Sequence, residues 1–126
     1  MWKGVNSLAA KLRKGKNYRH LPAFLLLFLA ENPAHGGALL TLLQKRLPTP
    51  HVDSGAVYRA LQDLEKKGAV DFRWDTKDPG PAKKIYTITA KGWDMLADFE
   101  ADIVMRVKNL TFFLETYRSL KTTEFS

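Results

Sequence analysis

The sequence predicts a mainly α-helical fold with one small β-hairpin, and three stretches support this prediction. Residues 52–70 have the pattern of one capped, amphipathic helix. Two strand-like runs, VDFRWDT and KIYTIT, then flank the turn-rich, basic segment DTKDPGPAKK. Residues 93–120 contain neither Gly nor Pro, which indicates one long helix. A helix that leads into a hairpin with a basic tip has the outline of a winged helix-turn-helix, here followed by a long C-terminal helix.

The helix in residues 52–70 has a start, an apolar stripe and a stop. Asp53 is a suitable N-cap, because its carboxylate can accept a backbone N–H of the first turn. The stripe comes from Val57, Leu61 and Leu64, which share one helix face, and Gly68 ends the helix. The residues off the stripe face outward: Ser54, Tyr58, Arg59, Gln62 and Lys66. Their hydroxyls, amide and guanidinium could reach phosphates or base edges, and backbone N–H groups at Ser54 and Gly55 could hold a phosphate. For Tyr58, half-buried packing is the alternative.

Two shorter helices are expected before this one. Pro22 suits the first turn of a helix, and the apolar run that follows it ends at Pro33, which cannot continue the hydrogen-bond ladder. That helix is apolar on all sides and should be largely buried. The next helix is expected at about residues 35–47, with leucines along its apolar stripe.

The net charge of +7 is concentrated at the N-terminus. Residues 1–20 hold six of the 20 Lys and Arg residues and none of the 13 Asp and Glu residues. This basic arm indicates a polyanionic partner, such as nucleic acid or an anionic surface; a solvated tail that aids solubility is the alternative. A short amphipathic helix is expected at about residues 5–14. The arm cations expected to touch DNA are Arg13, Lys14, Lys16 and Arg19.

The long C-terminal helix carries a heptad-like apolar seam. Apolar residues recur every seven positions at Leu96, Ile103, Leu110 and Tyr117. Val107 and Leu114 follow four positions after Ile103 and Leu110. The helix would be longer than a small winged domain can cover, so a second copy in a two-fold dimer is the expected partner. A helix that folds back on its own domain is the alternative. The expected dimer-interface residues are Leu96, Phe99, Ile103, Val107, Leu110, Leu114 and Tyr117.

Several motifs now occur in order. LLFLAENPAHGG joins the first two expected helices, DSGAVYRALQDLEKKGAV is the capped helix, GPAKKIYTIT is the second strand, and Gly92 follows. Together they resemble the PadR family of winged-helix transcriptional regulators over about residues 21–120. HGG, VYRALQ, DPGPAKKIY and the basic arm are most similar to the branch that contains polyhydroxybutyrate-responsive repressors.

The resemblance implies a dimer joined by its C-terminal helices, recognition helices in adjacent major grooves, and wings against the flanking DNA backbone. It also implies a repressor that a small ligand releases. On the wing, Lys83 and Lys84 are expected to contact phosphate or the minor groove, with a solvated hairpin tip as the alternative. Trp93 is the nearest large aromatic to the expected effector site, where the wing domain meets the dimer helices; hinge packing is its alternative role.

These observations predict three parts: a basic arm at residues 1–20, a winged helix-turn-helix DNA-binding domain at 21–90, and a dimerisation helix at 91–121. The predicted function is a dimeric, sequence-specific, DNA-binding transcriptional regulator, a repressor released by a small-molecule or polymer effector. The alternative is a surface-associated or protein-interaction module that uses the basic amphipathic arm, with the winged fold as scaffold.

Other classes of function are not expected. The chain has no Cys, no Gly-rich phosphate loop and no apolar run long enough to span a bilayer. Its three His residues are widely separated, so no metal site, no other cofactor and no enzyme activity are predicted. A cytoplasmic, nucleoid-associated protein is the expectation.

Overall fold

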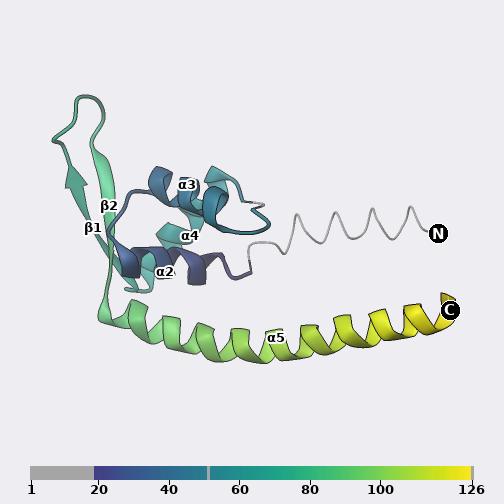
Figure 1. Cartoon of the computed structure of the whole chain (residues 1–126). Helices are drawn as coiled ribbons and strands as arrows, with labels where there is room; N and C mark the ends of the chain where they lie inside the picture. Colours follow the sequence, from purple (N-terminus) through teal and green to yellow (C-terminus); the bar gives the residue numbers. More distant parts are fainter. Residues whose placement is uncertain (1–18, 51, 126) are drawn as a thin grey trace. The chain divides into compact units, whose positions relative to one another are not determined.

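The structure, a computed structural model, describes residues 19–50 and 52–125. The elements in chain order are α2 (Leu21–Glu31), α3 (Gly36–Arg46), α4 (Ser54–Lys66), β1 (Val70–Asp75), β2 (Lys83–Ile88) and α5 (Ala90–Phe125) (Figure 1). The prediction of a mainly helical fold with one hairpin and a long C-terminal helix is confirmed. The helix expected at residues 5–14 lies outside the described residues.

The chain divides into two compact units, Met1–Leu96 and Ala97–Ser126. In the first unit, α2, α3 and α4 surround an aliphatic core. Leu25 and Leu26 of α2, Leu39 and Leu43 of α3, and Leu61 of α4 have no exposed surface. This core is the expected outcome of the apolar run in α2 meeting the stripes of the two following helices.

The hairpin pairs β1 with β2 in antiparallel register, from Val70 opposite Ile88 to Asp75 opposite Lys83. A third, one-residue strand, which the sequence pattern did not reveal, joins it from the α2–α3 connection. Ala34 donates its N–H to the Tyr86 carbonyl at 3.2 Å, and Tyr86 donates to the Ala34 carbonyl at 2.8 Å. The hairpin is thereby hydrogen-bonded to the helical part of the unit.

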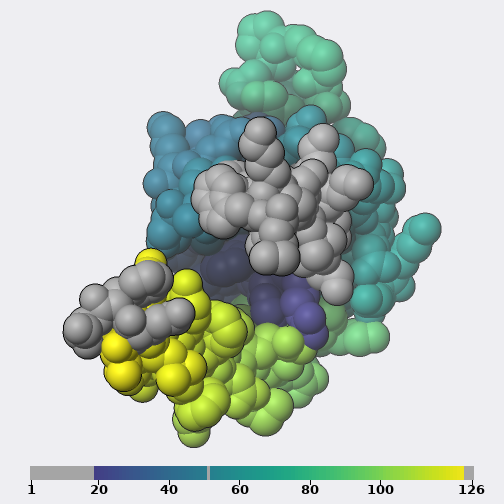
Figure 2. All heavy atoms as spheres, turned by 90° about the vertical axis from the view of Figure 1, so that its right-hand side faces the viewer, coloured from purple at the N-terminus to yellow at the C-terminus, as the bar shows by residue number. Residues whose placement is uncertain are grey.

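The apolar–polar alternation of VDFRWDT is typical of a half-buried strand, whereas most of β1 is exposed. Only Val70 is buried, while the side chains of Phe72 and Trp74 are 39% and 60% exposed. The cause is geometric, because the outer part of the hairpin extends past α2, α3 and α4 (Figure 1). In the space-filling view, its tip stands clear of these helices at the top (Figure 2).

The start of α5 packs closely on the base of the hairpin. Thr89 precedes the helix; its hydroxyl donates to the Gly68 carbonyl at 2.7 Å and accepts from the Gly92 N–H at 3.2 Å. A Cβ on Gly92 would lie 2.4 Å from the Ala69 carbonyl oxygen and 2.5 Å from Ile88 Cγ1. Gly92, a residue type that weakens a helix, is therefore needed for this approach.

The second unit is the remainder of α5. Its large apolar side chains are mostly exposed, and an Asp102–Arg106 ion pair of 2.8 Å lies beside them. Phe113 and Tyr117, one turn apart, stack with their ring centroids at 6.1 Å. The exposed apolar residues of this unit are Val104, Met105, Val107, Leu110, Phe112, Phe113, Leu114, Tyr117 and Leu120.

Gly92→Ala should destabilise the protein, although Ala normally stabilises a helix interior by about 0.5–1 kcal/mol relative to Gly. The added methyl meets backbone and Ile88, and such overpacking costs about 1–3 kcal/mol. Urea denaturation followed by circular dichroism measures the free energy of unfolding. The neighbouring exposed substitution Lys91→Ala should stay within about 0.5 kcal/mol of the parent. A Gly92→Ala variant as stable as the parent would contradict this packing.

Candidate nucleic-acid interface

The α4 helix has the cap, the buried stripe and the exposed face that its sequence predicts. The Asp53 carboxylate accepts the Ala56 N–H at 2.8 Å, and Gly68 has a φ of +77°, the left-handed conformation that follows a helix end. Ala56 and the predicted stripe residues face the core. The outward-facing side chains are exposed, as expected: Ser54, Tyr58, Arg59, Gln62 and Lys66.

Arg59 lies along the first turns of α4. Its Nη1 is 3.0 Å from the position that a Cβ on Gly55 would occupy. The guanidinium therefore covers Gly55, near the positive end of the helix dipole. The absence of a side chain at Gly55 makes room for this arrangement, so the two residues act together on the exposed face.

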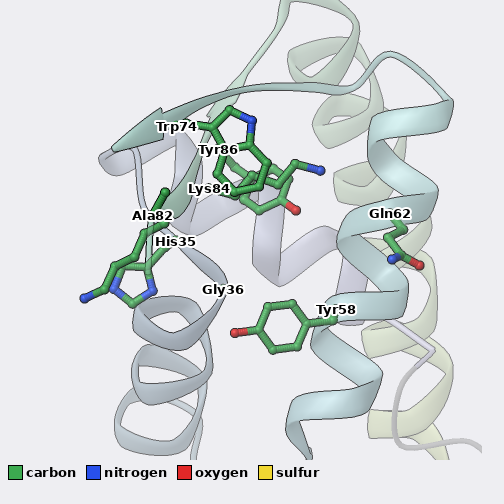
Figure 3. Close-up of a pocket in the computed structure, with 9 residues that line it drawn as sticks. His35, Gly36, Tyr58, Gln62, Trp74, Ala82, Lys84 and Tyr86 are labelled. Carbon is green, nitrogen blue, oxygen red and sulfur yellow. The ribbon is translucent and has the colours of Figure 1, made fainter. Parts of the chain in front are cut away.

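Tyr58 connects α4 to the start of α3. A Cβ on Gly36 would lie 2.4 Å from Tyr58 Cε1, so the phenol ring occupies the space that the glycine leaves open. In Figure 3 the Tyr58 side chain points from α4 toward Gly36. Tyr58 is nevertheless 48% exposed, which means that it packs on one side and remains accessible on the other.

His35 is the N-cap of α3, a role that sequence reasoning missed. Its Nδ1 accepts the Ala38 N–H at 3.2 Å, so the ring proton belongs on Nε2. The sequence does place a polar residue, His35, three positions before Ala38 and at the start of a predicted helix. His is not among the usual capping residues, which concealed this signal.

The two wing lysines have different surroundings. Lys83 is exposed, whereas Lys84, on the other face of the strand, forms a 2.8 Å ion pair with Glu65 of α4. The hydrogen bond to Glu65 raises the pKa of Lys84, and partial burial lowers it by less. Lys84 is therefore a cation throughout the neutral pH range.

Three aromatic rings surround the Lys84 ammonium. Its Nζ lies 3.9 Å from the centroid of Phe72, 5.6 Å from that of Tyr86 and 6.0 Å from that of Trp74. Tyr86 is buried, and burial is the main cause that raises the pKa of its phenol, against a smaller lowering by Lys84. Hairpin packing, which the sequence favours for both Tyr86 and Trp74, agrees with the burial of Tyr86. Trp74 contacts Phe72 edge-on but is mostly exposed.

A hollow of about 360 Å³ separates the exposed face of α4 from the wing (Figure 3). Polar and aromatic groups from α3, α4 and both strands line it. It is an open surface between the two elements that were expected to approach DNA. The lining residues are His35, Gly36, Tyr58, Gln62, Trp74, Ala82, Lys83, Lys84 and Tyr86.

The other predicted site residues lie elsewhere. Arg13, Lys14 and Lys16 are outside the described residues, and Arg19, just before α2, is exposed. Trp93, on α5, is 55% exposed. Within residues 19–50 and 52–125, no group of three or more His, Cys, Asp or Glu side chains could hold a metal ion.

Along the expected dimer seam, the side chains become more exposed toward the C-terminus. Leu96, Phe99 and Ile103 are half-buried in the single chain. The seam residues that follow them are all exposed: Val107, Leu110, Leu114 and Tyr117. Across the part of the chain that the structure describes, no helix is long and apolar enough to cross a membrane.

Solved structures of transcription regulators share this fold. A PadR family transcriptional regulator from Eggerthella lenta is 27% identical, with a TM-score of 0.66; the match covers 90% of this chain and 95% of that one. A PadR-like regulator from Bacillus cereus is 25% identical over 82% of this chain and 96% of that one, also with a TM-score of 0.66. A conserved protein described as a potential transcriptional factor is 30% identical over 79% and 89%, with a TM-score of 0.68.

Comparison with curated protein sequences finds no significant match. The profile of the transcriptional regulator PadR-like family, in contrast, matches residues 25–98, which include α3, α4, the hairpin and the start of α5. The matched residues contain the exposed face of α4 and the wing. Members of this family are DNA-binding transcription regulators and not enzymes, in agreement with the prediction from the sequence. The chain belongs to the PadR-like family of transcriptional regulators.

Proposed function

We propose that the protein is a homodimeric repressor that binds a specific DNA sequence and is released from it by a ligand. The observation that carries this proposal is the exposed face of α4, which offers a hydroxyl, a phenol, a guanidinium and an amide. The phenol of Tyr58 and the amide of Gln62 line an open hollow beside the wing. These groups supply the donors and acceptors that base edges and phosphates require. A repressor acts by occupying its DNA site, and this surface supports that mode of action.

The DNA contacts that we propose fall into two groups. Tyr58, Arg59 and Gln62 project from α4 and are suited to the major groove, where base edges can be distinguished. Ser54 and Gly55, at the positive end of the helix, are suited to a backbone phosphate. On the wing, Lys83 is exposed and suited to the flanking backbone, which positions a protein without reading sequence.

The dimer is supported by the apolar stripe of α5. Leu110 is 63% exposed in the single chain, and Val107, Leu114 and Tyr117 are exposed on the same side of the helix. Large contiguous apolar surfaces are rare on monomers and mark sites of association. A second copy of the same helix would cover the stripe with a matching one, and a two-fold dimer would present two α4 helices to two half-sites.

For release, we propose that a small-molecule or polymer effector contacts Trp93. The indole is a large aromatic surface, half of which is exposed, and it lies in the first turn of α5, next to the closely packed Gly92. A ligand that stacks on this ring would act where α5 leaves the hairpin. A change in the direction of α5 would then alter the spacing of the two recognition helices.

Leu110→Asp with Leu114→Asp should convert the dimer into a monomer at micromolar concentration. Both side chains are exposed in the single chain, so the monomer should still fold. At a helix–helix interface, each carboxylate would be buried without a partner, which costs several kcal/mol. Light scattering coupled to size-exclusion chromatography measures the molar mass.

Ala101→Asp with Lys108→Asp places two carboxylates at exposed positions away from this stripe and serves as the control. It should remain dimeric. A monomeric parent protein, or a dimeric Leu110→Asp/Leu114→Asp variant, would contradict the proposed interface.

Arg59→Ala tests whether α4 reads sequence. If Arg59 contacts a base, the substitution should cost about 1–3 kcal/mol on the preferred duplex and less on a scrambled one. The preferred duplex is obtained by selection from a random pool, and both duplexes are titrated by fluorescence anisotropy. Arg118→Ala removes the same charge from an exposed position in the second unit and should change neither affinity measurably. Equal reductions on both duplexes would assign Arg59 to the DNA backbone.

Removal of residues 2–16 tests the basic arm, because it deletes five cations and no acid. Affinity for both duplexes should fall, and the slope of log K against log salt should decrease by about one for each phosphate that the arm no longer neutralises. A full-length variant with these five cations changed to Gln distinguishes the effect of the lost charge from the effect of the shorter chain. A salt slope that does not change in either variant would favour the alternative in which the arm binds a surface other than DNA.

A further inference from the structure

The ion pair between Lys84 and Glu65 is the least exposed of the ion pairs among the described residues. The Lys84 side chain is 28% exposed and that of Glu65 is 34% exposed, against 53% and 54% for Lys67 and Asp63 at the C-terminal end of α4. Water screens such a partly buried pair less than it screens a pair on the surface. The attraction between Lys84 and Glu65 is therefore screened less than that between Lys67 and Asp63.

The groups around this cation come from three different elements. Glu65 belongs to α4, Phe72 and Trp74 to β1, and Tyr86 to β2, beside Lys84 itself. The strand register places Trp74 opposite Lys84 and Phe72 opposite Tyr86, so all of these side chains lie on one face of the hairpin. An ammonium is attracted to the faces of aromatic rings, and a carboxylate at 2.8 Å fixes its direction. We call Glu65, Lys84 and the three rings the wing latch.

The wing latch closes one side of the hollow between α4 and the wing. Lys84, Trp74 and Tyr86 line this hollow, and Gln62 lies opposite on α4, one turn before Glu65 (Figure 3). If the ion pair broke, the hairpin would lose its only ion pair to α4 among the described residues. The distance and angle between the wing and the exposed face of α4 would then no longer be fixed by it.

We propose that Lys84 is a positioning residue that sets the wing against the recognition helix through the wing latch, and so controls how well the protein distinguishes its preferred DNA from other sequences. This inference rests on the proposed DNA-binding function. Lys84 then acts without touching DNA, in contrast to Lys83, its exposed neighbour on the other face of the strand. The two lysines are adjacent in the sequence, but Lys84 is half-buried and Lys83 is exposed.

The reason that selectivity is affected lies in the two modes of DNA binding. Non-specific binding is mainly electrostatic and tolerates a variable geometry. Binding to a specific site requires base contacts from α4 and backbone contacts from the wing at the same time. A displaced wing therefore weakens specific binding and leaves non-specific binding largely intact.

The substitution Glu65→Gln separates this inference from simple electrostatics. Removal of one acid from a DNA-binding protein should strengthen its attraction to DNA or leave it unchanged. The wing latch predicts the opposite for the preferred duplex, an affinity about tenfold weaker, with scrambled DNA within about twofold of the parent. Asp63→Asn is the matched control, because it removes the same charge from the same helix and breaks only the exposed pair with Lys67. It should shift both affinities equally.

A double-mutant cycle with Lys84→Met distinguishes positioning from direct contact. If Lys84 acts through Glu65, the double variant should bind the preferred duplex no worse than either single variant, and the salt slope should stay constant. If Lys84 touches a phosphate, the effects of the two substitutions should add, both duplexes should be weakened, and the slope should decrease by about one. The double variant leaves neither charge unpaired, so it remains informative if a single variant folds poorly.

A readout without DNA completes the test. The protein is labelled with 5-fluorotryptophan, and Trp74→Phe assigns the resonance of Trp74 in the ¹⁹F NMR spectrum. Glu65→Gln should shift or broaden this resonance, and Asp63→Asn should not. The wing latch would be overturned if Glu65→Gln left the Trp74 resonance unchanged. It would also be overturned if the effects of Glu65→Gln and Lys84→Met on affinity were additive, even for a parent protein that prefers one DNA sequence. If Glu65→Gln shifts the Trp74 resonance as expected but the parent protein binds all duplexes equally, the proposed DNA-binding function is wrong. The control of selectivity by Lys84 would then be wrong as well.

Discussion

Tyr86 is the point at which the hairpin and the helices are joined. Its backbone exchanges two hydrogen bonds with Ala34, from the α2–α3 connection, while its side chain is buried. Lys84 lies two positions before Tyr86 on the same face of β2, and Phe72 lies opposite Tyr86 on β1. A two-stranded hairpin has little stability alone in water. Tyr86 therefore stabilises the wing in two ways, because its backbone pairs with the one-residue strand at Ala34 and its ring is buried.

The surroundings of Tyr86 also connect the wing to the exposed face of α4. Tyr58 packs on Gly36 at the start of α3, directly after the connection that pairs with Tyr86. Two short-range constraints, a missing Cβ and a one-residue strand, thus hold three separate segments in one place. The DNA-facing geometry that we propose therefore depends on these close approaches between backbone and rings as well as on the Lys84–Glu65 ion pair.

Features governed by local sequence could be predicted, and features governed by tertiary contact could not. The bounds of α2 and α4 follow from Pro22, Asp53 and Gly68, whose effects act within a few residues. The Ala34 strand has no pattern because it is one residue long. The ion pair of Lys84 joins residues 19 positions apart, and only the register of the hairpin shows that Lys84 faces inward. The exposure of Trp74 could not be predicted from its alternation either, because it depends on how far the hairpin extends past the helices.

The distribution of charge along α4 explains why its N-terminal half is the better surface for DNA. The two acids within the helix, Asp63 and Glu65, both lie in its C-terminal half, where Lys67 and Lys84 neutralise them. In the N-terminal half, the carboxylate of Asp53 is engaged as the cap, and Arg59 adds a cation to the positive end of the dipole. The positive end of the helix dipole and the Arg59 guanidinium therefore lie together at the turns that carry Tyr58 and Arg59. A net charge concentrated in the arm would attract DNA from a distance, whereas this local positive charge favours one orientation of α4 once DNA is near.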